Sequence, residues 1–259
     1  MTAPPYTATE LMIVEGSRHL EDGQVVVVGT GLPVAATVLA EYTHAPNLVI
    51  IAETGSVAPT VLPGVMAVSD PRICYRAMQV GSLVDVLACV LQRGLCDVGF
   101  LGGAQIDRYG NLNSSWIGSG GDRPRVRLVG SGGASDIAAC ATRTLIITRH
   151  EKRRFVERCD YVTSPGFLDG PGARERYGLP GGGPERIITD LGVMRFHPTT
   201  KQMMVEKLHP GVTLERIQEQ TGFELLHADT ITETEPPDAH TLEVLRTRVD
   251  PHRTYSGGA

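Results

Sequence analysis

One carboxylate stands at the end of an apolar run in the stretch NLVIIAETGS, residues 47–56. Residues 48–52 are typical of a buried strand, and Glu53 follows them directly, before Thr54 and Gly55. Ligands of open α/β sheets bind at the carboxyl ends of strands, where Glu53 is expected to lie. A carboxylate partly withdrawn from water becomes more nucleophilic or more basic, so Glu53 is our candidate catalytic residue. Position alone still favours a solvated or structurally paired glutamate.

A glycine-rich stretch, GSGGASD at residues 130–136, comes between an apolar run and a predicted helix. Its three glycines, Gly130, Gly132 and Gly133, leave room for a ligand. The exposed N–H groups at such a helix start bind a phosphate or an oxyanion. A simple tight turn would use the same residues, and the spacing supports both interpretations equally. No GK[ST] follows, so this is not a nucleotide-binding P-loop.

Two further stretches offer weaker signals. GTGLP at residues 29–33 contains Gly29 and Gly31 but lacks the third glycine of a dinucleotide fingerprint, so NAD binding is not favoured. In GGAQIDRYGNLNSS, residues 102–115, the amides of Gln105 and Asn113 offer donors for a developing negative charge. Any polar turn uses Asn and Gly as well, and locally that interpretation is preferred.

Other kinds of chemistry find little support. The basic run RHEKRRF, residues 149–155, is interpreted as a solvated or interface face of a helix, although it would also suit a partner's acids or a phosphate of CoA. The eight histidines show no HExxH or paired ligand spacing, so we expect no metal. A GxSxG nucleophile elbow is absent from the sequence.

The elements that must position these residues alternate in type. A β-branched strand at 24–28, a glycine turn, a helix from Pro33 to about Thr43 and the strand at 48–52 form a βαβ unit. The alternation continues to about Pro165. We predict a helix within 81–94 with Ser82 as N-cap, a strand at 97–103, a strand, loop and helix over 126–143, and a strand at 144–150. A helix at 151–159 and a strand at 160–165 follow.

The amino-acid composition of the chain changes after Pro165. Residues 164–186 are rich in Gly and Pro and predict a long ordered loop, which we interpret as a functional lid or a partner-binding segment. Short strands joined by turns follow over 186–211, and amphipathic helices are expected at 213–222 and 237–250. The prediction is one α/β domain over residues 1–259, with an open, mostly parallel sheet covered by helices and a β-containing C-terminal part.

The amino-acid composition limits the kinds of function that this chain can have. The chain has 259 residues, 41% of them hydrophobic and 20% charged, which is ordinary for a globular protein. The net charge of −5 shows no excess of basic residues of the kind that binds nucleic acid. Five cysteines without a CxxC pair suggest buried thiols in a reducing compartment. No run of eighteen apolar residues and no signal-peptide pattern occur, so we expect a cytoplasmic protein that does not span a membrane.

Seven stretches together resemble the β subunit of glutaconate CoA-transferase, a class I CoA-transferase. They are GTGLP (29–33), AETGS (52–56), FLGGAQIDRYGNLNSS (100–115), GSGGASDIA (130–138), HEKRRF (150–155), YVTSPGFLDGPGARER (161–176) and YGLPGGGP (177–184). The resemblance runs from about Gly23 to Asp250. It implies the CoA-transferase α/β fold and an α-type partner chain that binds much of the CoA and completes a site between the two chains.

The resemblance also implies a mechanism. The family's nucleophilic glutamate lies in an E-x-G turn after a strand, and Glu53 holds that position here. The implied reaction is ping-pong, through a mixed anhydride and a glutamyl-CoA thioester, with CoA as a substrate and no permanently bound cofactor. The 130–134 loop would supply backbone N–H groups to the oxyanions, most directly from Gly132 or Gly133, and Asn113 would add a side-chain donor.

The substrate acids are not readable from the sequence. Arg174 and Arg176 in the long loop are candidates for the far carboxyl group of a dicarboxylate, although they suit a partner surface or solvent equally. Ser56 is a further substrate-side candidate, while Gly29, Gly31, Gly130 and Gln105 are candidates for CoA or oxyanion binding.

Two other functions remain open. Relatives with this fold include a decarboxylase branch with Cys at the glutamate position and a hydrolase branch that has lost the E-x-G form. An acyl-CoA hydrolase or lyase with Glu53 as general base is therefore the main alternative. A phosphosugar or nucleotide sensor is a non-enzymatic alternative, disfavoured because no DNA-binding segment is visible.

Overall fold

The structure is a computed structural model that describes residues 5–67, 69–118 and 125–257. The chain divides into two compact units. Unit 1 comprises Met1–Phe100 and Glu235–Ala259, and unit 2 comprises Leu101–Thr234. Unit 1 is therefore built from two segments that are far apart in the sequence, whereas unit 2 is one continuous insertion between them.

Unit 1 is a five-stranded sheet with helices. Its elements are α1 (Ala8–Arg18), β1 (Val25–Val28), α2 (Leu32–Tyr42), β2 (Val49–Ala52), β3 (Ser56–Val57), η1 (Pro71–Cys74), β4 (Gln79–Val80), η2 (Asp85–Leu91), β5 (Val98–Leu101, which ends at the boundary), α6 (Ala239–Val244) and η3 (Leu245–Val249). The strand order is β5-β1-β2-β3-β4. β1 pairs in parallel with β2 and β5, and β3 and β4 continue antiparallel.

The central strands form because of their residue types. β1 consists of four valines, and a β-branched run of this kind suits a strand with both faces covered. α2 begins after Gly31 with Pro33 in its first turn, where a missing N–H does no harm. The predicted βαβ unit is confirmed, and it places the ends of β1 and β2 side by side.

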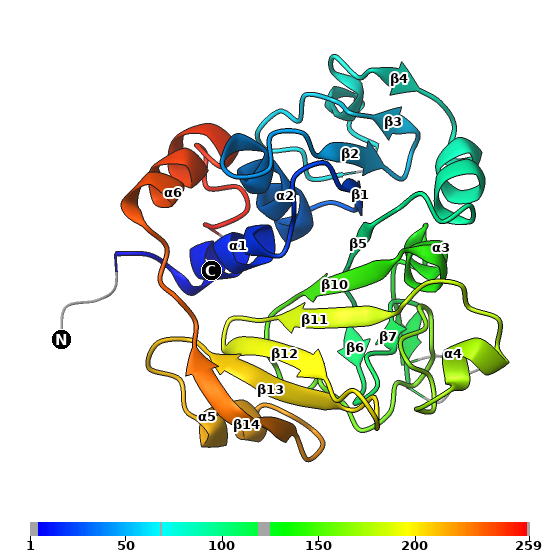
Figure 1. Ribbon diagram of the computed structural model, residues 1–259, viewed down its shortest axis with the longest axis vertical. Helices are drawn as coiled ribbons and strands as arrows, with labels where there is room; N and C mark the ends of the chain where they lie inside the picture. Colours follow the sequence, from blue (N-terminus) through cyan, green and yellow to red (C-terminus); the bar gives the residue numbers. More distant parts are fainter. Residues whose placement is uncertain (1–4, 68, 119–124, 258–259) are drawn as a thin grey trace. The chain divides into compact units, whose positions relative to one another are not determined.

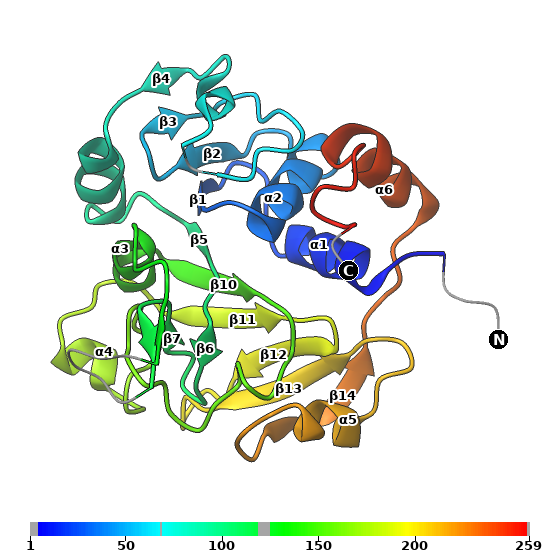
Figure 2. The ribbon, with the colours of Figure 1, turned by 180° about the vertical axis from the view of Figure 1, so that it is seen from behind.

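Both ends of unit 1 are fastened to one another. α6 lies beside α1 and α2 in opposite views (Figures 1 and 2). Arg246 Nε donates to Glu10 Oε1 at 2.7 Å, and the pairing lowers the pKa of the Glu10 carboxyl. The Tyr255 hydroxyl donates to Val65 O at 2.8 Å. The C-terminal segment is thus part of the structure of unit 1.

Unit 2 contains the second group of strands. Its elements are β6 (Gln105–Ile106), β7 (Leu112–Asn113), β8 (Trp116–Ile117), β9 (Val126–Arg127), α3 (Ala134–Cys140), β10 (Arg143–Ile147), α4 (Ala173–Arg176), β11 (Pro184–Ile188), β12 (Gly192–Phe196), β13 (Met203–Leu208), α5 (Leu214–Glu219) and β14 (Leu226–Glu233). The order is β14-β13-β12-β11-β10. β11 is parallel to β10, β11 to β13 form an antiparallel meander, and β14 is parallel to β13.

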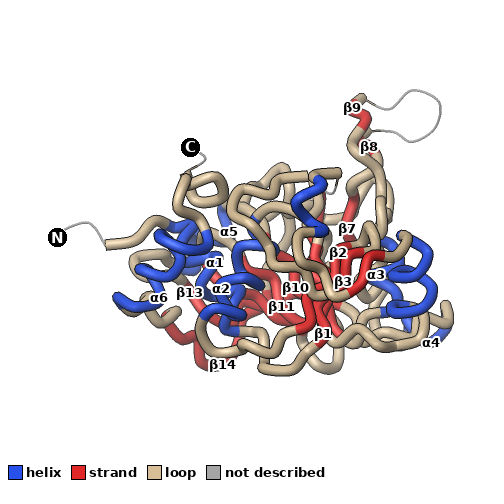
Figure 3. The backbone as a smooth tube through the Cα atoms, turned by 90° about the horizontal axis from the view of Figure 1, so that it is seen from above, coloured by secondary structure: helices blue, strands red, loops and turns tan. Residues whose placement is uncertain are grey.

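Two small hairpins lie outside that order. β6 pairs with β7, and β8 pairs with β9. Figure 3 shows β8 and β9 as an arm that extends from the rest of unit 2. At the base of this arm Trp116 packs on Tyr161, with ring centroids 3.9 Å apart. Leu128 and Val129, which follow β9, lead directly into the glycine-rich loop.

Several sequence-based expectations for single elements are wrong. Residues 151–159, predicted as a helix, form turns, because Ile106 N–H donates to Arg154 O at 2.7 Å and draws this stretch against β6. Residues 160–165 are not a strand and contribute only an isolated bridge from Ser164 to Leu112. The apolar run at 126–129 forms a two-residue hairpin strand instead of a sheet strand. The long 164–186 segment is a loop with one helical turn, α4, before β11 begins.

The prediction of a single domain over 1–259 stays a prediction, because two compact units do not decide whether each folds by itself. Within the described ranges, no helix combines the length and the apolar character needed to cross a membrane.

Candidate functional site

Glu53 lies in the turn that reverses the chain between β2 and β3. β2 ends at Ala52, Gly55 N–H donates to Ala52 O at 3.0 Å, and Ile51 then pairs with Val57 on β3. The Glu53 side chain is half-buried, and it has interaction partners within the chain. A carboxylate at the carboxyl end of a parallel strand is positioned as the sequence predicts.

The turn depends on the absence of a side chain at Gly55. Its φ is +116°, and a Cβ there would lie 2.3 Å from Gly81 O. Gly81 N–H donates to Gly55 O at 2.9 Å, so the backbone just before η2 is pressed against the turn. The path of the chain after Glu53 is therefore fixed by close backbone contact.

The neighbouring residues hold this turn from both sides. Val28 pairs with Ala52, so the Gly29–Gly31 turn follows β1 at the same edge as Glu53. The Ser56 side chain is 1% exposed, and its hydroxyl donates to Ile73 O at 2.8 Å. Ser56 therefore joins β3 to η1, and its contact with a substrate stays a prediction.

Thr54 is the residue in this turn that the sequence did not single out. Its Oγ1 is buried and has no hydrogen-bond partner among the residues that the structure describes. An unpaired hydroxyl immediately after Glu53 is unusual, because buried polar groups are nearly always hydrogen-bonded. No sequence signal marks it, since Thr is an ordinary turn residue.

In the glycine-rich loop of unit 2, the N–H groups of Gly130 and Ala134 donate to backbone carbonyls, whereas that of Gly132 does not. Gly130 N–H donates to Ser114 O at 2.8 Å, and the Ser114 hydroxyl donates back to Gly130 O at 2.8 Å. Gly130 is therefore a structural residue with φ +98°. Gly132, at φ +49°, is exposed, and its N–H donates to no backbone carbonyl in the described part of the chain. Gly133 is buried and precedes the first turn of α3.

The two predicted amide donors meet one another. Asn113 Nδ2 donates to Gln105 Oε1 at 2.7 Å and to Trp116 O at 2.7 Å, so both of its N–H bonds are used inside the protein. Gln105 Nε2 donates to Asp160 Oδ2 at 3.0 Å. Both side chains are at most 5% exposed. This geometry does not support Asn113 as an oxyanion donor, and the pair instead ties β6 to β7 and to Asp160.

Arg174 is also structural. Its side chain is 5% exposed and donates to five carbonyl oxygens at 2.9 to 3.3 Å. Two of these are the Ala138 and Ala139 carbonyls near the carboxyl end of α3, where helix carbonyls lack partners. Burial lowers the pKa of this guanidinium. Arg176 is exposed and pairs with Asp169 at 2.8 Å. Because Arg174 makes five hydrogen bonds to backbone carbonyls, this geometry does not support it as a partner for a substrate carboxylate.

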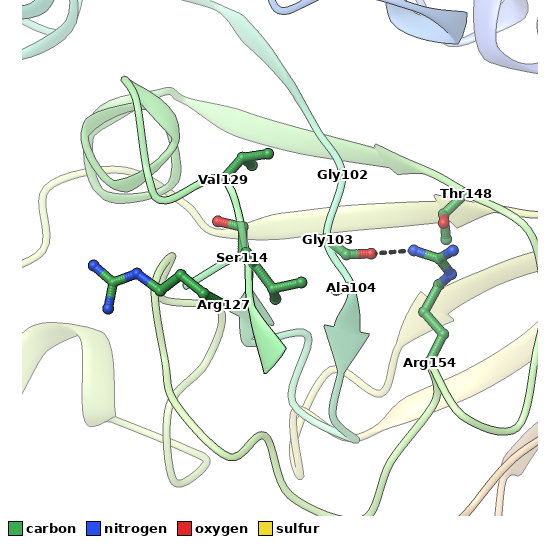
Figure 4. A pocket seen from close by; sticks show the side chains of 9 residues that line it. Gly102, Gly103, Ala104, Ser114, Arg127, Val129, Thr148 and Arg154 are labelled. Atoms are coloured by element: carbon green, nitrogen blue, oxygen red, sulfur yellow. Dashed lines mark hydrogen bonds between the residues drawn. The ribbon is translucent and has the colours of Figure 1, made fainter. Parts of the chain in front are cut away.

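A cavity of about 670 Å³ lies in unit 2, beside these loops. Its lining comes from segments that are separate in the sequence: Gly102, Gly103, Ala104, Ser114, Arg127, Leu128, Val129, Thr148 and Arg154. Figure 4 shows Arg154 extending toward Gly103 and Thr148, whereas the guanidinium of Arg127 points away from the other lining side chains. Arg154 is thus the cation that faces into the cavity.

The sequence-predicted residues therefore fall into two groups. In unit 1 the structure brings Glu53 together with the turn that contains Gly29 and Gly31. In unit 2 it brings Gln105 together with Asn113, and it places Gly130 against Ser114 at the cavity wall. The sequence missed Arg154 as a lining residue because its basic run was expected to form a solvated or interface face of a helix. Among residues 5–67, 69–118 and 125–257, no three His, Cys, Asp or Glu cluster so as to hold a metal ion.

Comparison with known proteins defines the class to which this chain belongs. The family model described as coenzyme A transferase matches residues 9–220. The chain is 42% identical over 243 residues to the B subunit of the 3-oxoadipate CoA-transferase of Pseudomonas knackmussii, across 93% of this chain and 92% of that protein. It is 39% identical to the B subunit of the glutaconate CoA-transferase of Acidaminococcus fermentans, across 96% of this chain and 95% of that protein. The chain belongs to the coenzyme A transferase family and is a CoA-transferase.

Structural comparison leads to the same family. The crystal structure of the Acidaminococcus fermentans glutaconate CoA-transferase matches with a TM-score of 0.90 and 38% identity, over 98% of this chain and 99% of that chain. The predicted fold class, a large and mostly parallel sheet with helices, is thereby confirmed. A more distant relative is the cholesterol ring-cleaving hydrolase IpdB subunit of Mycobacterium tuberculosis, 27% identical over 95% of this chain and 95% of that protein.

Proposed function

We propose that this chain is the B-type subunit of a CoA-transferase that moves CoA between short dicarboxylic acids through a thioester on Glu53. The observation that carries the proposal is the Glu53 turn, which holds one carboxylate at the carboxyl end of β2 by a glycine with no room for a Cβ. The names of the two similar transferases support the substrate class, because 3-oxoadipate and glutaconate are both dicarboxylates.

The reaction proceeds in two half-reactions. A Glu53 carboxylate oxygen attacks the thioester carbonyl carbon and the C–S bond breaks. CoA leaves as a thiolate, and the acyl group stays on Glu53 as a mixed anhydride. The thiolate then attacks the glutamyl carbonyl carbon, which releases the first acid as its carboxylate and leaves a glutamyl-CoA thioester. The carboxylate of the second acid attacks this thioester, and the same steps run in reverse. Both acylated intermediates hydrolyse readily, so the site must exclude water.

Each attack creates an oxyanion that needs donors. Backbone N–H groups aimed at the developing charge are the usual source, and loss of one such donor costs about 3 kcal/mol of transition-state stabilisation. We assign this role to the loop with Gly132 and Gly133, in which Gly132 is exposed. Asn113 is excluded from the assignment because both of its N–H bonds are internal.

A second, A-type chain is part of the proposal. The two similar transferase chains are each named as a B subunit, which implies a partner chain in those enzymes. We infer that this chain requires such a partner to bind CoA and to close the site. All five cysteines are free thiols, which supports assembly in a reducing compartment such as the cytoplasm.

The test is a search for the covalent intermediate. The chain would be co-expressed with a candidate A-type chain, purified as the complex and incubated with a dicarboxylic acyl-CoA without acceptor acid. Mass spectrometry should then find a CoA-sized addition on the peptide that contains Glu53, and borohydride should reduce the thioester. Glu53→Gln should show no addition, whereas Glu21→Gln, which changes an exposed glutamate outside the turn, should retain it.

The competing function is hydrolysis of an acyl-CoA with Glu53 as general base. The similar IpdB chain is named as a hydrolase that cleaves a cholesterol ring, so it supports hydrolytic chemistry on this fold but not the thioester as the bond that is cut. In that reaction Glu53 would remove a proton from water without forming a bond to CoA. Steady release of free CoA with no adduct at any time would reject the transferase mechanism and favour the hydrolase.

A further inference from the structure

The turn that carries Glu53 also contains a buried hydroxyl without a partner. Thr54 Oγ1 has no contact with solvent and makes no hydrogen bond within the part of the chain that the structure describes. The buried Thr37, by contrast, donates from Oγ1 to Pro33 O at 2.9 Å, which is how a threonine in a protein interior is ordinarily satisfied. An unsatisfied buried hydroxyl destabilises a folded chain, and such groups are rare. Its place beside Glu53 suggests a role in the reaction.

Thr54 and Glu53 are the central residues of one tight turn. Gly55 N–H donates to Ala52 O at 3.0 Å, and neither central residue has a positive φ, which is the pattern of a type I turn. The backbone directly after the turn is pinned, because a Cβ on Gly55 would lie 2.3 Å from Gly81 O. A backbone shift that would bring the hydroxyl to a new partner is opposed by this contact.

The mobile acceptor closest along the chain is the side chain of Glu53. Because Thr54 Oγ1 is covered, a molecule from solvent reaches it only after protein atoms move, whereas a side chain of the same turn needs only a change of rotamer. In the resting chain the Glu53 side chain has other partners. Acylation replaces its charged carboxylate with a neutral carbonyl, which changes those contacts and creates an oxygen that needs a new donor.

We propose, on the basis of the proposed function for the acylated form of Glu53, that the Thr54 hydroxyl donates a hydrogen bond to the carbonyl oxygen of acylated Glu53. Thr54 is then a further catalytic residue of the transfer reaction. Donor and acceptor belong to one turn of unit 1, between β2 and β3.

The hydroxyl acts whenever the Glu53 carbonyl carbon is attacked. As the CoA thiolate adds to the mixed anhydride, an electron pair of the C=O bond moves to oxygen, and this oxyanion accepts the Thr54 hydrogen bond. The C–O bond to the first acid then breaks, the acid leaves as its carboxylate, and the proton stays on Thr54. The same donor serves when the second acid attacks the glutamyl-CoA thioester and the C–S bond breaks. The oxyanion of the very first attack forms on the acyl carbon of the substrate, so Thr54 contributes to the later steps.

The test follows the Glu53 thioester through a single turnover. The complex of this chain with its A-type partner would be loaded with glutaryl-CoA, freed of excess donor and mixed with glutarate, and mass spectrometry of quenched samples gives the rate at which the thioester disappears. Thr54→Val keeps the branched shape without the hydroxyl and should slow this step about 100-fold, the size expected for one oxyanion donor. Thr54→Ser keeps the hydroxyl and should react at close to the wild-type rate.

Stability supplies a measurement that needs no turnover. Thr54→Val removes an unsatisfied hydroxyl, so its midpoint of urea unfolding should be at least as high as that of wild type. The matched control is Thr200→Val, because Thr200 Oγ1, in the turn before β13, is also buried without a partner among the described residues. This control should shift the urea midpoint in the same direction and leave the thioester rate unchanged.

Three results would overturn the inference. The first is a wild-type thioester rate in Thr54→Val. The second is a rate for Thr54→Ser as slow as that of Thr54→Val, which would show that packing and not the hydroxyl matters. The third is a lower urea midpoint for Thr54→Val, which would show that the hydroxyl is already bonded in the resting protein. If wild type forms no Glu53 adduct, the proposed function fails and this role of Thr54 fails with it. A normal adduct with an unaffected Thr54→Val rejects the role of Thr54 alone.

Discussion

Arg174 and Arg154 are both largely withdrawn from water, yet they differ in what their N–H groups contact. Arg174 joins the end of α3 to the loop before α4 and to Gly181, through carbonyl oxygens alone. Arg154 has one such carbonyl and an open cavity beside it. The sequence shows two basic residues in polar stretches, and only the fold decides which one is enclosed by backbone.

Replacement of Arg174 should therefore affect stability. Arg174→Gln leaves several buried carbonyls without donors, and we expect a loss of roughly 3 kcal/mol in the free energy of unfolding. Urea unfolding checks this value. Arg176→Gln, on the exposed neighbour, should change stability by no more than about 0.5 kcal/mol. Equal effects of the two substitutions would contradict the structural role of Arg174.

His150 is a second residue whose environment the sequence did not reveal. It is 4% exposed and stacks on Phe155 with ring centroids 3.9 Å apart. Its Nε2 lies 2.9 Å from Thr221 Oγ1, and its Nδ1 lies 3.3 Å from Thr189 Oγ1. Burial without a charged partner lowers the pKa of His150 from 6.5 to about 3. The imidazole is therefore neutral in the folded protein, where it joins β11 to the end of α5.

This lowered pKa makes stability depend on pH in a definite direction. Between a pH of about 6.5 and about 3, the unfolded chain binds a proton at His150 that the folded chain does not. Stability should therefore fall as the pH falls through this window, by up to about 1.4 kcal/mol per pH unit from this residue. Urea unfolding at a series of pH values, in wild type and in His150→Gln, measures the contribution.

His150→Gln should be less stable than wild type at neutral pH, because it loses the stacked ring. Its free energy of unfolding should fall less steeply as the pH falls. His252→Gln, at an exposed histidine, should keep the wild-type slope. Identical slopes in wild type and His150→Gln would show that His150 is not the buried neutral group.

At the scale of elements, the β2–β3 turn should be highly sensitive to substitution of Gly55. Gly55→Ala would place a Cβ against Gly81 O, at a φ of +116° that L-residues rarely adopt. We expect a loss of about 2–4 kcal/mol and a displaced Glu53. The yield of the Glu53 adduct should fall with stability. Urea unfolding and adduct mass spectrometry together check this result.

Gly94→Ala provides the matched control. Gly94 has a φ of +70° and no atom within 4 Å of an added Cβ, so only backbone strain of about 1 kcal/mol is expected. Equal losses at the two glycines would show that the contact with Gly81 is not what shapes the turn.

Local patterns predicted most of the strands and helices. β1, β2, β5 and β10 are apolar runs with turn residues after them, and the predicted helices at α2, α3, α5 and α6 are present. The helix predicted at 151–159 failed because pairing with β6, a contact between distant segments, overrides local helix propensity. α1 was missed although Thr7 and Glu10 form a capping box, a signal that can be read from sequence.

The sequence predicted the site residues of unit 1 better than those of unit 2. Glu53 and Gly55 could be identified from the sequence because a strand end followed by a turn is a local pattern. Asn113 and Arg174 could not be excluded from a ligand role, because their partners, Trp116 O and the α3 carbonyls, depend on folding. Arg154 could not be found at all, since the cavity that it lines is assembled from segments up to about fifty residues apart.

At the scale of the molecule, the two compact units allow the single-domain prediction to be tested. The chain has one tryptophan, Trp116, and it lies in unit 2. If the chain unfolds as one domain, Trp116 fluorescence and far-UV circular dichroism should report the same urea midpoint and slope. A fluorescence transition separate from the dichroism transition would show that unit 2 unfolds independently.

The two-segment construction of unit 1 has a consequence for synthesis on the ribosome. Leu242, Leu245 and Val249 are buried side chains of unit 1, and Arg246 and Tyr255 fasten its first hundred residues to its last ones. Chains generally fold domain by domain as they emerge, from the N-terminus onward. Here the first segment of unit 1, up to Phe100, must wait for the segment that begins at Glu235. Unit 2, though made after the first segment of unit 1, is complete before unit 1 is. A nascent chain stopped before Glu235 would expose the apolar surface of the unit that carries Glu53.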